Sequence, residues 1–325
     1  MMYQVSKIVN TFVVMKLKGR FAPSPSGRMH LGNIYSALLS WLSVKSRGGE
    51  WLLRIEDLDR QRCRREYAEQ FEDDLLWLGL VWDEGGSRGG DCGPYYQSLR
   101  NNIYISELEK IRAKGLLYPC YCRRADILAA RAPHATDGNV VYQGRCRHLS
   151  DAERQQLAAE RQPATRIMVP DADVSFTDGH YGLQRANLVR DCGDFIVRRA
   201  DGNFAYQLAV VVDDALMGVG EVVRGCDLIS STHQQIYLYQ LLGYEVPKFA
   251  HLPLLVNANG QRLSKRDAST DMGYLRQHFT PERLLGFLAF KAKIIDSYTD
   301  ISLSELLQVF DWGRIPHDDI KIEAE

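Results

Sequence analysis

The stretch of sequence that decides the fold is Gly19-Arg-Phe-Ala-Pro-Ser-Pro-Ser-Gly-Arg-Met-His-Leu-Gly-Asn33. A short strand is predicted over Leu17–Phe21, and a loop rich in proline, serine and glycine follows it. Apolar residues at helical spacing then predict a helix from about Leu31 to Lys45, and Trp51–Ile55 has the composition of a buried strand. Because strand, helix and strand follow one another within about 40 residues, we expect a βαβ unit and a parallel α/β sheet.

Composition indicates a globular chain of about two domains. The chain has 325 residues, of which 40 are basic and 41 acidic, and its 5 Trp, 16 Tyr and 11 Phe exclude wholesale disorder. We expect no membrane-spanning segment, because no apolar run approaches roughly 18–20 residues. The odd number of cysteines, seven, favours a reducing, cytoplasmic location over a disulfide framework. We also expect a monomer, and no signal peptide whether translation starts at Met1, Met2 or Met15.

The pattern changes further along the chain. Amphipathic helices are predicted over Glu66–Leu78 and Asn102–Lys114. From about residue 118 the helical periodicity weakens and cysteines cluster, which indicates an insertion into the α/β domain. The segments predicted beyond the insertion are short strands over 194–198 and 204–212, a helix over 234–242, and a helical region from Pro281 to Glu325.

The loop before the first helix has the chemistry of an anion site. The N-terminus of a helix presents unpaired N–H groups and the positive end of the helix dipole. His30 and Asn33 lie one turn apart there, so both side chains can donate to one anion, and Gly32 allows a ligand to approach the backbone closely. The same three residues also fit an ordinary turn between a strand and a helix.

The stretch from Gly19 to Asn33 resembles the first signature of the class I aminoacyl-tRNA synthetases, in the form carried by the glutamyl and glutaminyl enzymes. Asn33 stands where that signature has its second histidine. Further similar segments follow in family order: Arg54-Ile-Glu-Asp-Leu-Asp59, Asp74–Leu80 with Trp82–Glu84, Tyr96-Gln-Ser98, Tyr118–Cys122, Val223-Arg-Gly-Cys-Asp-Leu228, His251-Leu-Pro253 and Arg262-Leu-Ser-Lys-Arg266.

The resemblance implies a Rossmann-type parallel-sheet core with a zinc-bearing insertion and a C-terminal helical region that contacts a tRNA stem. The expected divisions of the chain are an N-terminal extension (1–18), the first half of the catalytic domain (19–117), an acceptor-binding-like insertion (118–190), the second half of the catalytic domain (191–255), and the lysine loop with the stem-contact region (256–325).

The resemblance also implies a site for each substrate of amino-acid activation. ATP, with Mg²⁺, is expected at His30, Gly32, Asn33 and Lys265, and His30, Asn33 and Lys265 are the expected catalytic residues. Glutamate carries two carboxylates and one ammonium, so its site needs arginines and an acid. The matching residues are Arg20, Ser24, Glu56, Tyr206 and Arg224.

Structural alternatives stay open for some of these residues. Glu56 could instead cap the next helix, and Tyr206 could belong to the core. Asp57 and Asp59 are expected to brace the turn rather than to contact substrate.

A cysteine cluster lies in the predicted insertion. Cys120, Cys122 and Cys146 could supply three corners of a tetrahedral Zn²⁺ site, or they could be three small buried thiols. Relatives of the glutamyl enzyme that modify tRNA(Asp) carry C-x-C…Y-x₃-C as zinc ligands, and the resemblance therefore implies Tyr142 as the fourth ligand. A phenolate is unusual on zinc, and His148 is the alternative fourth ligand. The other four cysteines are expected to be structural.

Length separates the members of this family. A full glutamyl enzyme continues into an anticodon-binding domain, whereas only residues 270–325 follow the lysine loop here. The chain therefore resembles the short glutamyl-Q branch, which activates glutamate with ATP without needing tRNA. That branch transfers the glutamyl group to the cyclopentenediol of queuosine at the wobble position of tRNA(Asp).

The expected RNA contacts are the arginines near the insertion, Arg123, Arg124, Arg145 and Arg147, although these also fit a solvated face. Two alternative functions remain. One is a truncated glutamyl-tRNA synthetase that charges tRNA(Glu), and the other is a catalytically inactive tRNA-binding paralogue.

Overall fold

The computed structural model describes residues 16–123, 141–142, 144–263 and 271–322. The helices of these residues are α1 (Leu31–Lys45), α2 (Arg65–Trp77), α3 (Asn101–Ala113), α5 (Asp151–Glu160), α6 (Tyr206–Leu216), α7 (Ile229–Leu242), α8 (Met272–His278), α9 (Pro281–Lys291) and α10 (Leu303–Val309). The strands are β1 (Lys18–Phe21), β2 (Glu50–Leu53), β3 (Glu84–Gly85), β4 (Leu117–Cys120), β5 (Ala164–Ile167), β6 (Asp173–Asp178), β7 (Gly182–Asn187), β8 (Phe195–Arg198), β9 (Glu221–Gly225), β10 (Lys248–Leu252), β11 (Leu255–Val256) and β12 (Ile320–Lys321).

A five-stranded parallel sheet forms the centre of the molecule, in the order β10-β9-β1-β2-β3. The chain runs outward from β1 to β3 on one side and from β9 to β10 on the other. The strand order therefore reverses between β1 and β9, and ligands bind at the carboxyl ends of the strands at such a reversal. The predicted parallel α/β sheet is confirmed, and helix α1 has the predicted bounds.

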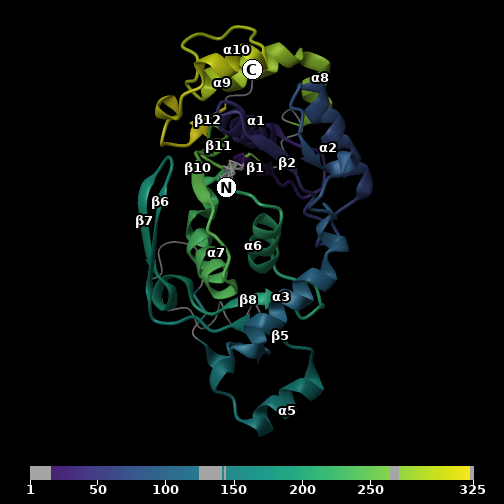
Figure 1. Cartoon of the computed structure of the whole chain (residues 1–325), viewed down its shortest axis with the longest axis vertical. Helices are drawn as coiled ribbons and strands as arrows, with labels where there is room; N and C mark the ends of the chain where they lie inside the picture. The colour runs from purple at the N-terminus through teal and green to yellow at the C-terminus, as the bar shows by residue number, and fades with distance from the viewer. Residues whose placement is uncertain (1–15, 124–140, 143, 264–270, 323–325) are drawn as a thin grey trace, which may run out of the picture.

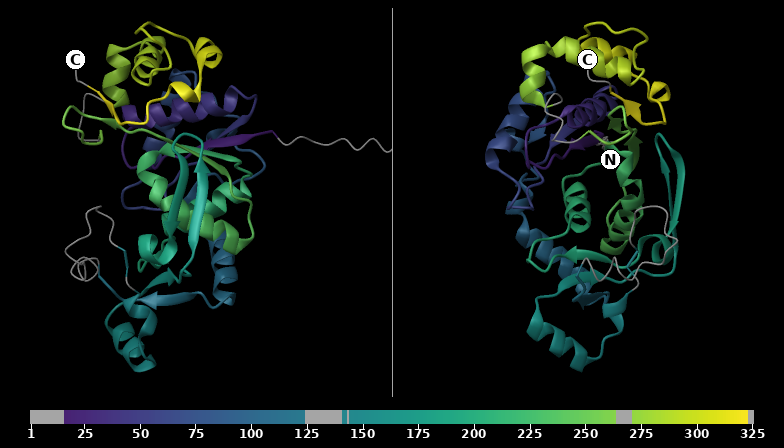
Figure 2. Two further views of the ribbon diagram at one scale, coloured as in Figure 1. Left: turned by 90° about the vertical axis from the view of Figure 1, so that its left-hand side faces the viewer. Right: turned by 180° about the vertical axis from the view of Figure 1, so that it is seen from behind.

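The insertion and the C-terminal helices lie at opposite ends of the molecule (Figure 1). An antiparallel sheet of β4, β5 and β8 and the helix α5 occupy one end, and α8, α9 and α10 occupy the other. The hairpin β6–β7 extends from the insertion back along α7 and β10. The two further views in Figure 2 show the same three tiers, with the parallel sheet in the middle.

Two expectations about secondary structure are wrong. One is the strand expected over Phe204–Val212, a run that ends in three consecutive valines. This run instead enters α6, in which the side chains from Leu208 to Asp214 are all buried. A short run of buried apolar residues is compatible with a buried strand as well as with a buried helix, so periodicity does not separate the two.

The chain is also not helical throughout from Pro281 onward. After α10 it forms β12, which pairs in parallel with β11. Ile320 and Ile322 are buried on either side of the exposed Lys321, and this alternation is the pattern of a strand.

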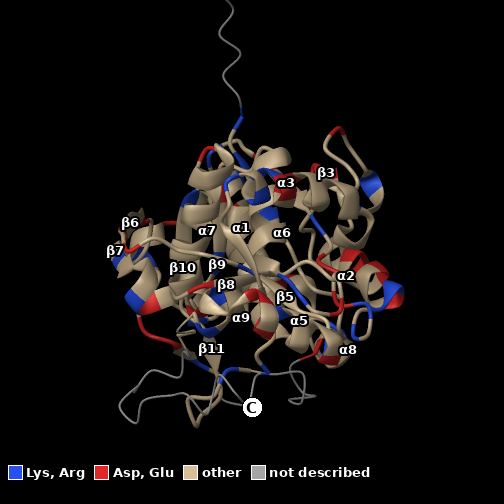
Figure 3. Cartoon of the chain, turned by 90° about the horizontal axis from the view of Figure 1, so that it is seen from below, with Lys and Arg blue, Asp and Glu red and all other residues tan. Residues whose placement is uncertain are grey.

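Basic and acidic residues are interspersed along the ribbon around α2 and α3 (Figure 3). None of the helices formed by the described residues has the length and apolar character that a membrane span requires.

A buried network of ion pairs joins the two halves of the parallel sheet. The guanidinium of Arg54, which follows β2, is fully buried and donates to Asp214 Oδ1 at 2.6 Å and to Glu56 Oε1 at 3.1 Å. The neighbouring carboxylate of Asp213 accepts from Arg100 Nε at 2.6 Å and from Tyr104 at 2.8 Å. Both aspartates lie near the end of α6. Their ion pairs with Arg54 and Arg100 therefore connect this helix to segments that are far away in the sequence.

We predict that Arg54→Leu destabilises the fold by about 3–5 kcal/mol, because removing one partner leaves buried carboxylates without their counter-charge. Chemical unfolding monitored by circular dichroism measures this change. Arg65→Leu is the matched control, because Arg65 pairs with Glu69 on the exposed surface of α2 and should shift the unfolding midpoint little. An equal effect of the two substitutions would contradict the role assigned to Arg54.

Candidate active site and metal centre

A cavity of about 300 Å³ opens at the carboxyl ends of β1 and β2. Three of the five residues predicted to bind glutamate line it. Ser24 comes from the loop after β1, Glu56 follows β2, and Tyr206 is the first residue of α6. The remaining lining is mixed: it includes the charged Asp59, Arg62 and Arg199 and the apolar Leu58, Ile196 and Phe204.

Arg20 and Arg224, the other two residues predicted to bind glutamate, do not line this cavity and lie buried beside Glu56 and Tyr206. Arg20 on β1 is buried, donates to the carbonyl oxygen of Val223 at 3.1 Å, and lies 3.5 Å from Asp214. Burial raises the pKa of Glu56, while the nearby Arg54 and Arg20 act in the opposite direction. The Glu56 carboxylate is therefore held by arginines rather than used as a helix cap.

Arg224 is a buried cation without a direct counter-charge. It lies on β9, only 6% of it is exposed, and among the described residues no carboxylate oxygen lies within 4.0 Å of its guanidinium. Its Nη1 faces the Tyr206 hydroxyl at 3.5 Å. Burial lowers the pKa of Arg224 and raises that of Tyr206, which keeps the phenol neutral. An arginine remains charged in proteins, so this position favours an anion.

A second pocket, of about 80 Å³, lies where the strand order of the sheet reverses. His30, Gly32 and Asn33 line it at the start of α1, together with Gly225 at the end of β9. His30 Nδ1 accepts a hydrogen bond from the backbone N–H of Gly32, and the Asn33 side chain accepts one from the backbone N–H of His30. The structure therefore gives His30 and Asn33 a reciprocal capping role at this helix N-terminus.

The other predicted residue of this pocket, Lys265, lies outside the described residues, as does Arg266. The chain that leads towards them is described up to Leu263. Arg262 forms an ion pair with Asp227, and both side chains line the pocket beside His30.

The turn after β2 is braced as the sequence predicted. Asp57 accepts from the backbone N–H and the hydroxyl of Ser98, at 2.8 and 2.6 Å. Asp59 accepts from Arg62 Nε at 2.7 Å.

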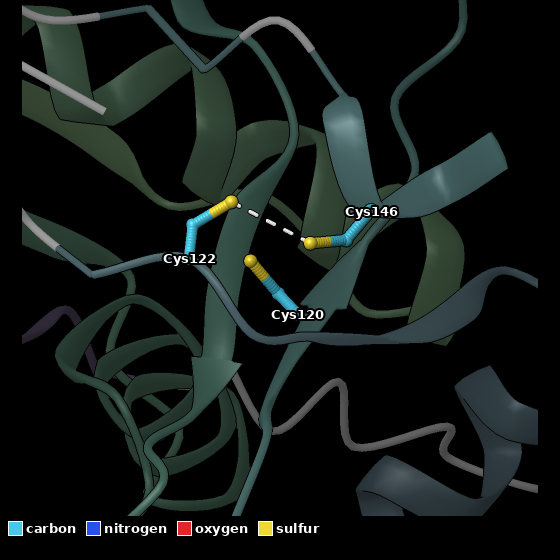
Figure 4. A group of neighbouring side chains, drawn as sticks. All are labelled: Cys120, Cys122 and Cys146. Atoms are coloured by element: carbon cyan, nitrogen blue, oxygen red, sulfur yellow. Dashed lines mark hydrogen bonds between the residues drawn. The ribbon is translucent and has the colours of Figure 1, made fainter. Parts of the chain in front are cut away.

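The three clustered cysteines meet in the insertion (Figure 4), and their sulfur atoms all lie within 4.8 Å of one another. The Sγ atoms of Cys122 and Cys146 are 3.5 Å apart, and the Tyr142 hydroxyl lies 3.6 Å from Cys120 Sγ and 3.7 Å from Cys122 Sγ. Bonds of about 2.3 Å around a tetrahedral ion place sulfur ligands about 3.8 Å apart. The four donor atoms therefore fit one metal ion, and the exposed His148 is not among them.

In the absence of a metal ion, burial of the cluster disfavours the charged forms of its thiols. Burial raises the pKa of the Cys122 thiol to about 11. Burial also opposes ionisation of Cys146, but hydrogen bonds from Tyr142 and from the backbone N–H of Tyr121 outweigh it and lower the pKa of that thiol. A metal ion would replace the thiol protons. All seven cysteines are free in the structure.

Several residues behind the sites were missed in the sequence. Asp213 and Asp214 interrupt an apolar run, and a carboxylate pair in such a run must be buried beside cations, which is a usable signal. Asp178 gave no such signal, because its partner His251 is 73 residues away in the sequence. Thr232 is only eight residues from its partner Arg224, but a single threonine carries no pattern that indicates such a contact.

Comparison with known proteins places these features in a family. The family described as tRNA synthetases class I (E and Q), catalytic domain, matches residues 16–308. A glutamyl-Q tRNA(Asp) synthetase of Symbiobacterium thermophilum is 49% identical over 95% of this chain and 97% of its own length. A glutamate–tRNA ligase 2 of Acidithiobacillus ferrooxidans is 43% identical over 82% of this chain and 56% of its own. The crystal structure of the glutamate–tRNA synthetase from Elizabethkingia anophelis superposes with a TM-score of 0.81 at 29% identity, over 95% of this chain and 68% of that one.

We predict that the purified protein holds about one equivalent of a divalent metal ion and that Cys120→Ser combined with Cys122→Ser abolishes it, because two of the four donors lose their thiolates. Elemental analysis by mass spectrometry measures the metal content. Cys92→Ser is the control, since Cys92 lies outside the cluster, and it should leave the content unchanged. Metal-free wild-type protein, purified without a chelator, would refute the site.

Proposed function

Since the chain belongs to the family of class I tRNA synthetases for glutamate and glutamine, and is therefore a ligase of the aminoacyl-tRNA synthetase type, we propose that it activates L-glutamate with ATP to form glutamyl-adenylate. It needs no tRNA for this step, and it then transfers the glutamyl group to the cyclopentenediol of queuosine in tRNA(Asp). The names of relatives at 49% and 45% identity support the acceptor.

The observation that carries the choice of amino acid is the unbalanced charge of Arg224. A buried guanidinium with no carboxylate within 4.0 Å in the described part of the chain is costly unless a ligand supplies the anion. A carboxylate of glutamate supplies it, and bidentate contact with arginine gives specificity as well as affinity.

The other four predicted residues complete the substrate contacts. Arg20 holds the second carboxylate of glutamate, and Glu56 accepts the α-ammonium group. The hydroxyls of Ser24 and Tyr206 donate further hydrogen bonds. The buried contacts of Arg20 and Glu56 with the ion-pair network hold both side chains in place before substrate arrives, which favours binding.

Activation is an in-line attack of the glutamate carboxylate on the α-phosphorus of ATP, with pyrophosphate leaving. The protein contributes position and charge rather than covalent chemistry. The phosphates lie at the N-terminus of α1, beside His30, Gly32 and Asn33. Lys265 supplies positive charge to the α-phosphate and pyrophosphate, and Mg²⁺ accompanies ATP.

The metal of the cysteine cluster is Zn²⁺, held by Cys120, Cys122, Cys146 and Tyr142 with a structural role. Thiolates prefer zinc among the common divalent ions of the cell, and four protein donors leave no open position for catalysis. The guanidinium of Arg166 lies 3.8 Å above the Tyr142 ring and donates to Cys120 Sγ at 3.2 Å. Its charge offsets part of the negative charge of the ligands.

In the transfer step a hydroxyl of the queuosine ring attacks the mixed anhydride and AMP leaves. The exposed Arg123, Arg145 and Arg147 near the insertion contact the RNA backbone, which positions the anticodon loop without reading its sequence. Arg124 belongs to the same group but lies outside the described residues.

A second candidate function is the charging of tRNA(Glu). It is favoured by the 43% identity with a glutamate–tRNA ligase, of which this chain spans 56%. The two candidates share glutamate activation and differ in the acceptor.

We predict that Glu56→Gln raises the KM for glutamate about 10- to 100-fold, because the ammonium loses a charge-assisted hydrogen bond. The KM for ATP should change little. Glutamate-dependent exchange between ATP and pyrophosphate, measured without tRNA, gives both constants. Protonation of Glu56 removes the same charge, so the wild-type KM for glutamate should rise as the pH falls through the raised pKa of this group. Glu69→Gln on the exposed face of α2 is the control, and an equal rise there would contradict the assignment.

The acceptor is tested with labelled glutamate, ATP and three RNAs, namely tRNA(Asp) with queuosine, tRNA(Asp) without it, and tRNA(Glu). We expect label only on the first, because the proposed nucleophile is a hydroxyl of the modified base. Equal labelling of both forms of tRNA(Asp) would refute the modification, and labelling of tRNA(Glu) alone would establish the second candidate. Absence of glutamate-dependent pyrophosphate exchange would identify an inactive paralogue.

A further inference from the structure

Apart from its contact with Tyr206, the Arg224 guanidinium is enclosed by three buried groups. Its Nε donates to His251 Nε2 at 3.2 Å, and its Nη2 donates to Thr232 Oγ1 at 2.8 Å. The ring of Phe249 lies below the guanidinium at 5.3 Å. Thr232 and His251 are fully buried, so these contacts are made without competition from water.

Hydrogen-bond chemistry fixes the tautomer of His251. A guanidinium can only donate, so Nε2 of the imidazole must accept and carries no proton. The proton therefore sits on Nδ1, which lies 2.6 Å from Asp178 Oδ2. Burial lowers the pKa of His251, against the effect of Asp178, and this keeps the ring neutral. The neutral ring thus connects an aspartate on one side to an arginine on the other.

Asp178 is itself held in one orientation. Its Oδ1 accepts from the backbone N–H groups of His180, Tyr181 and His251, at 3.0, 2.9 and 3.2 Å. With Oδ1 so occupied, Oδ2 is the oxygen left for the imidazole. Asp178 belongs to the end of β6 in the insertion, whereas Arg224 belongs to the central sheet.

We infer that Asp178 and His251, with Thr232, are positioning residues that set the direction of the Arg224 guanidinium and so present its Nη1 edge to the substrate carboxylate. This inference rests on the proposed function for the identity of the carboxylate. The relay itself is a property of the free protein. Asp178 fixes the imidazole proton on Nδ1 of His251, so that Nε2 carries no proton and can accept a hydrogen bond. This acceptor in turn orients Nε of Arg224.

Asp178→Asn tests the relay sharply. Because three backbone N–H groups face Oδ1, the amide of asparagine must place its oxygen there and its NH₂ group towards His251 Nδ1. Nδ1 must then accept, the ring proton moves to Nε2, and two donors face each other at Arg224. We expect the KM for glutamate in pyrophosphate exchange to rise about 10-fold or more, with the KM for ATP and kcat little changed. Asp173→Asn, at the exposed start of the same strand, should have no effect.

A second pair of variants keeps the test valid if Asp178→Asn fails to fold. Thr232→Val removes the acceptor for Arg224 Nη2 at nearly constant volume, whereas Thr232→Ser retains it. We expect the KM for glutamate to rise about 10-fold in the valine variant and to stay near the wild-type value in the serine variant. Equal KM values in all three proteins would overturn the inference.

The tautomer can be measured without any activity. In protein labelled with ¹⁵N-histidine, nitrogen chemical shifts should report His251 as the neutral Nδ1–H form in the wild type and as the Nε2–H form in Asp178→Asn. The Nε2–H form in the wild type, or no change on substitution, would overturn the relay. A wild-type protein with the expected tautomer but no glutamate-dependent exchange would instead refute the proposed function alone.

Discussion

The ion pairs around Arg54 are the interaction on which the rest of the site depends. This guanidinium lies between Glu56, which lines the amino-acid cavity, and Asp214, which also lies near Arg20. Burying so many charges is expensive unless each has a partner, so the network is stable only when β1, β2 and α6 are all in place. The same condition holds Arg20 and Glu56 close together at the carboxyl ends of β1 and β2. The fold and the cavity are therefore specified by one set of contacts.

Two kinds of charge balance occur side by side in this core. Arg54 meets its carboxylates directly, and the protein alone neutralises it. Arg224 reaches Asp178 only through a neutral imidazole, and on its other side it faces the Tyr206 hydroxyl. A guanidinium that is partly compensated keeps enough unmet charge to attract a carboxylate, yet its orientation is held before the ligand arrives. Preorganisation of this kind reduces the cost of binding.

The sequence predicted the elements and residues that a local pattern or a family resemblance can identify. The helix Leu31–Lys45 has a clear apolar period and clear boundaries, and its bounds are correct. The three cysteines and Tyr142 meet as the family resemblance implied, whereas the cysteine spacing alone left buried thiols as an alternative. The strand expected within 204–212 is wrong because a fully buried helix and a buried strand have the same apolar composition. The contacts of Asp178 were beyond reach, since they join residues 73 apart in the sequence through the tertiary fold.

The position of Asp178 has a consequence for how this enzyme family can be recombined. The hairpin β6–β7 pairs only with itself and lies outside the parallel sheet. Yet it contributes the only carboxylate that His251 contacts among the described residues. A chimera that exchanges this hairpin between relatives would therefore also exchange the acid that faces His251. Compatibility of donor and recipient would depend on a single acid at the tip of β6.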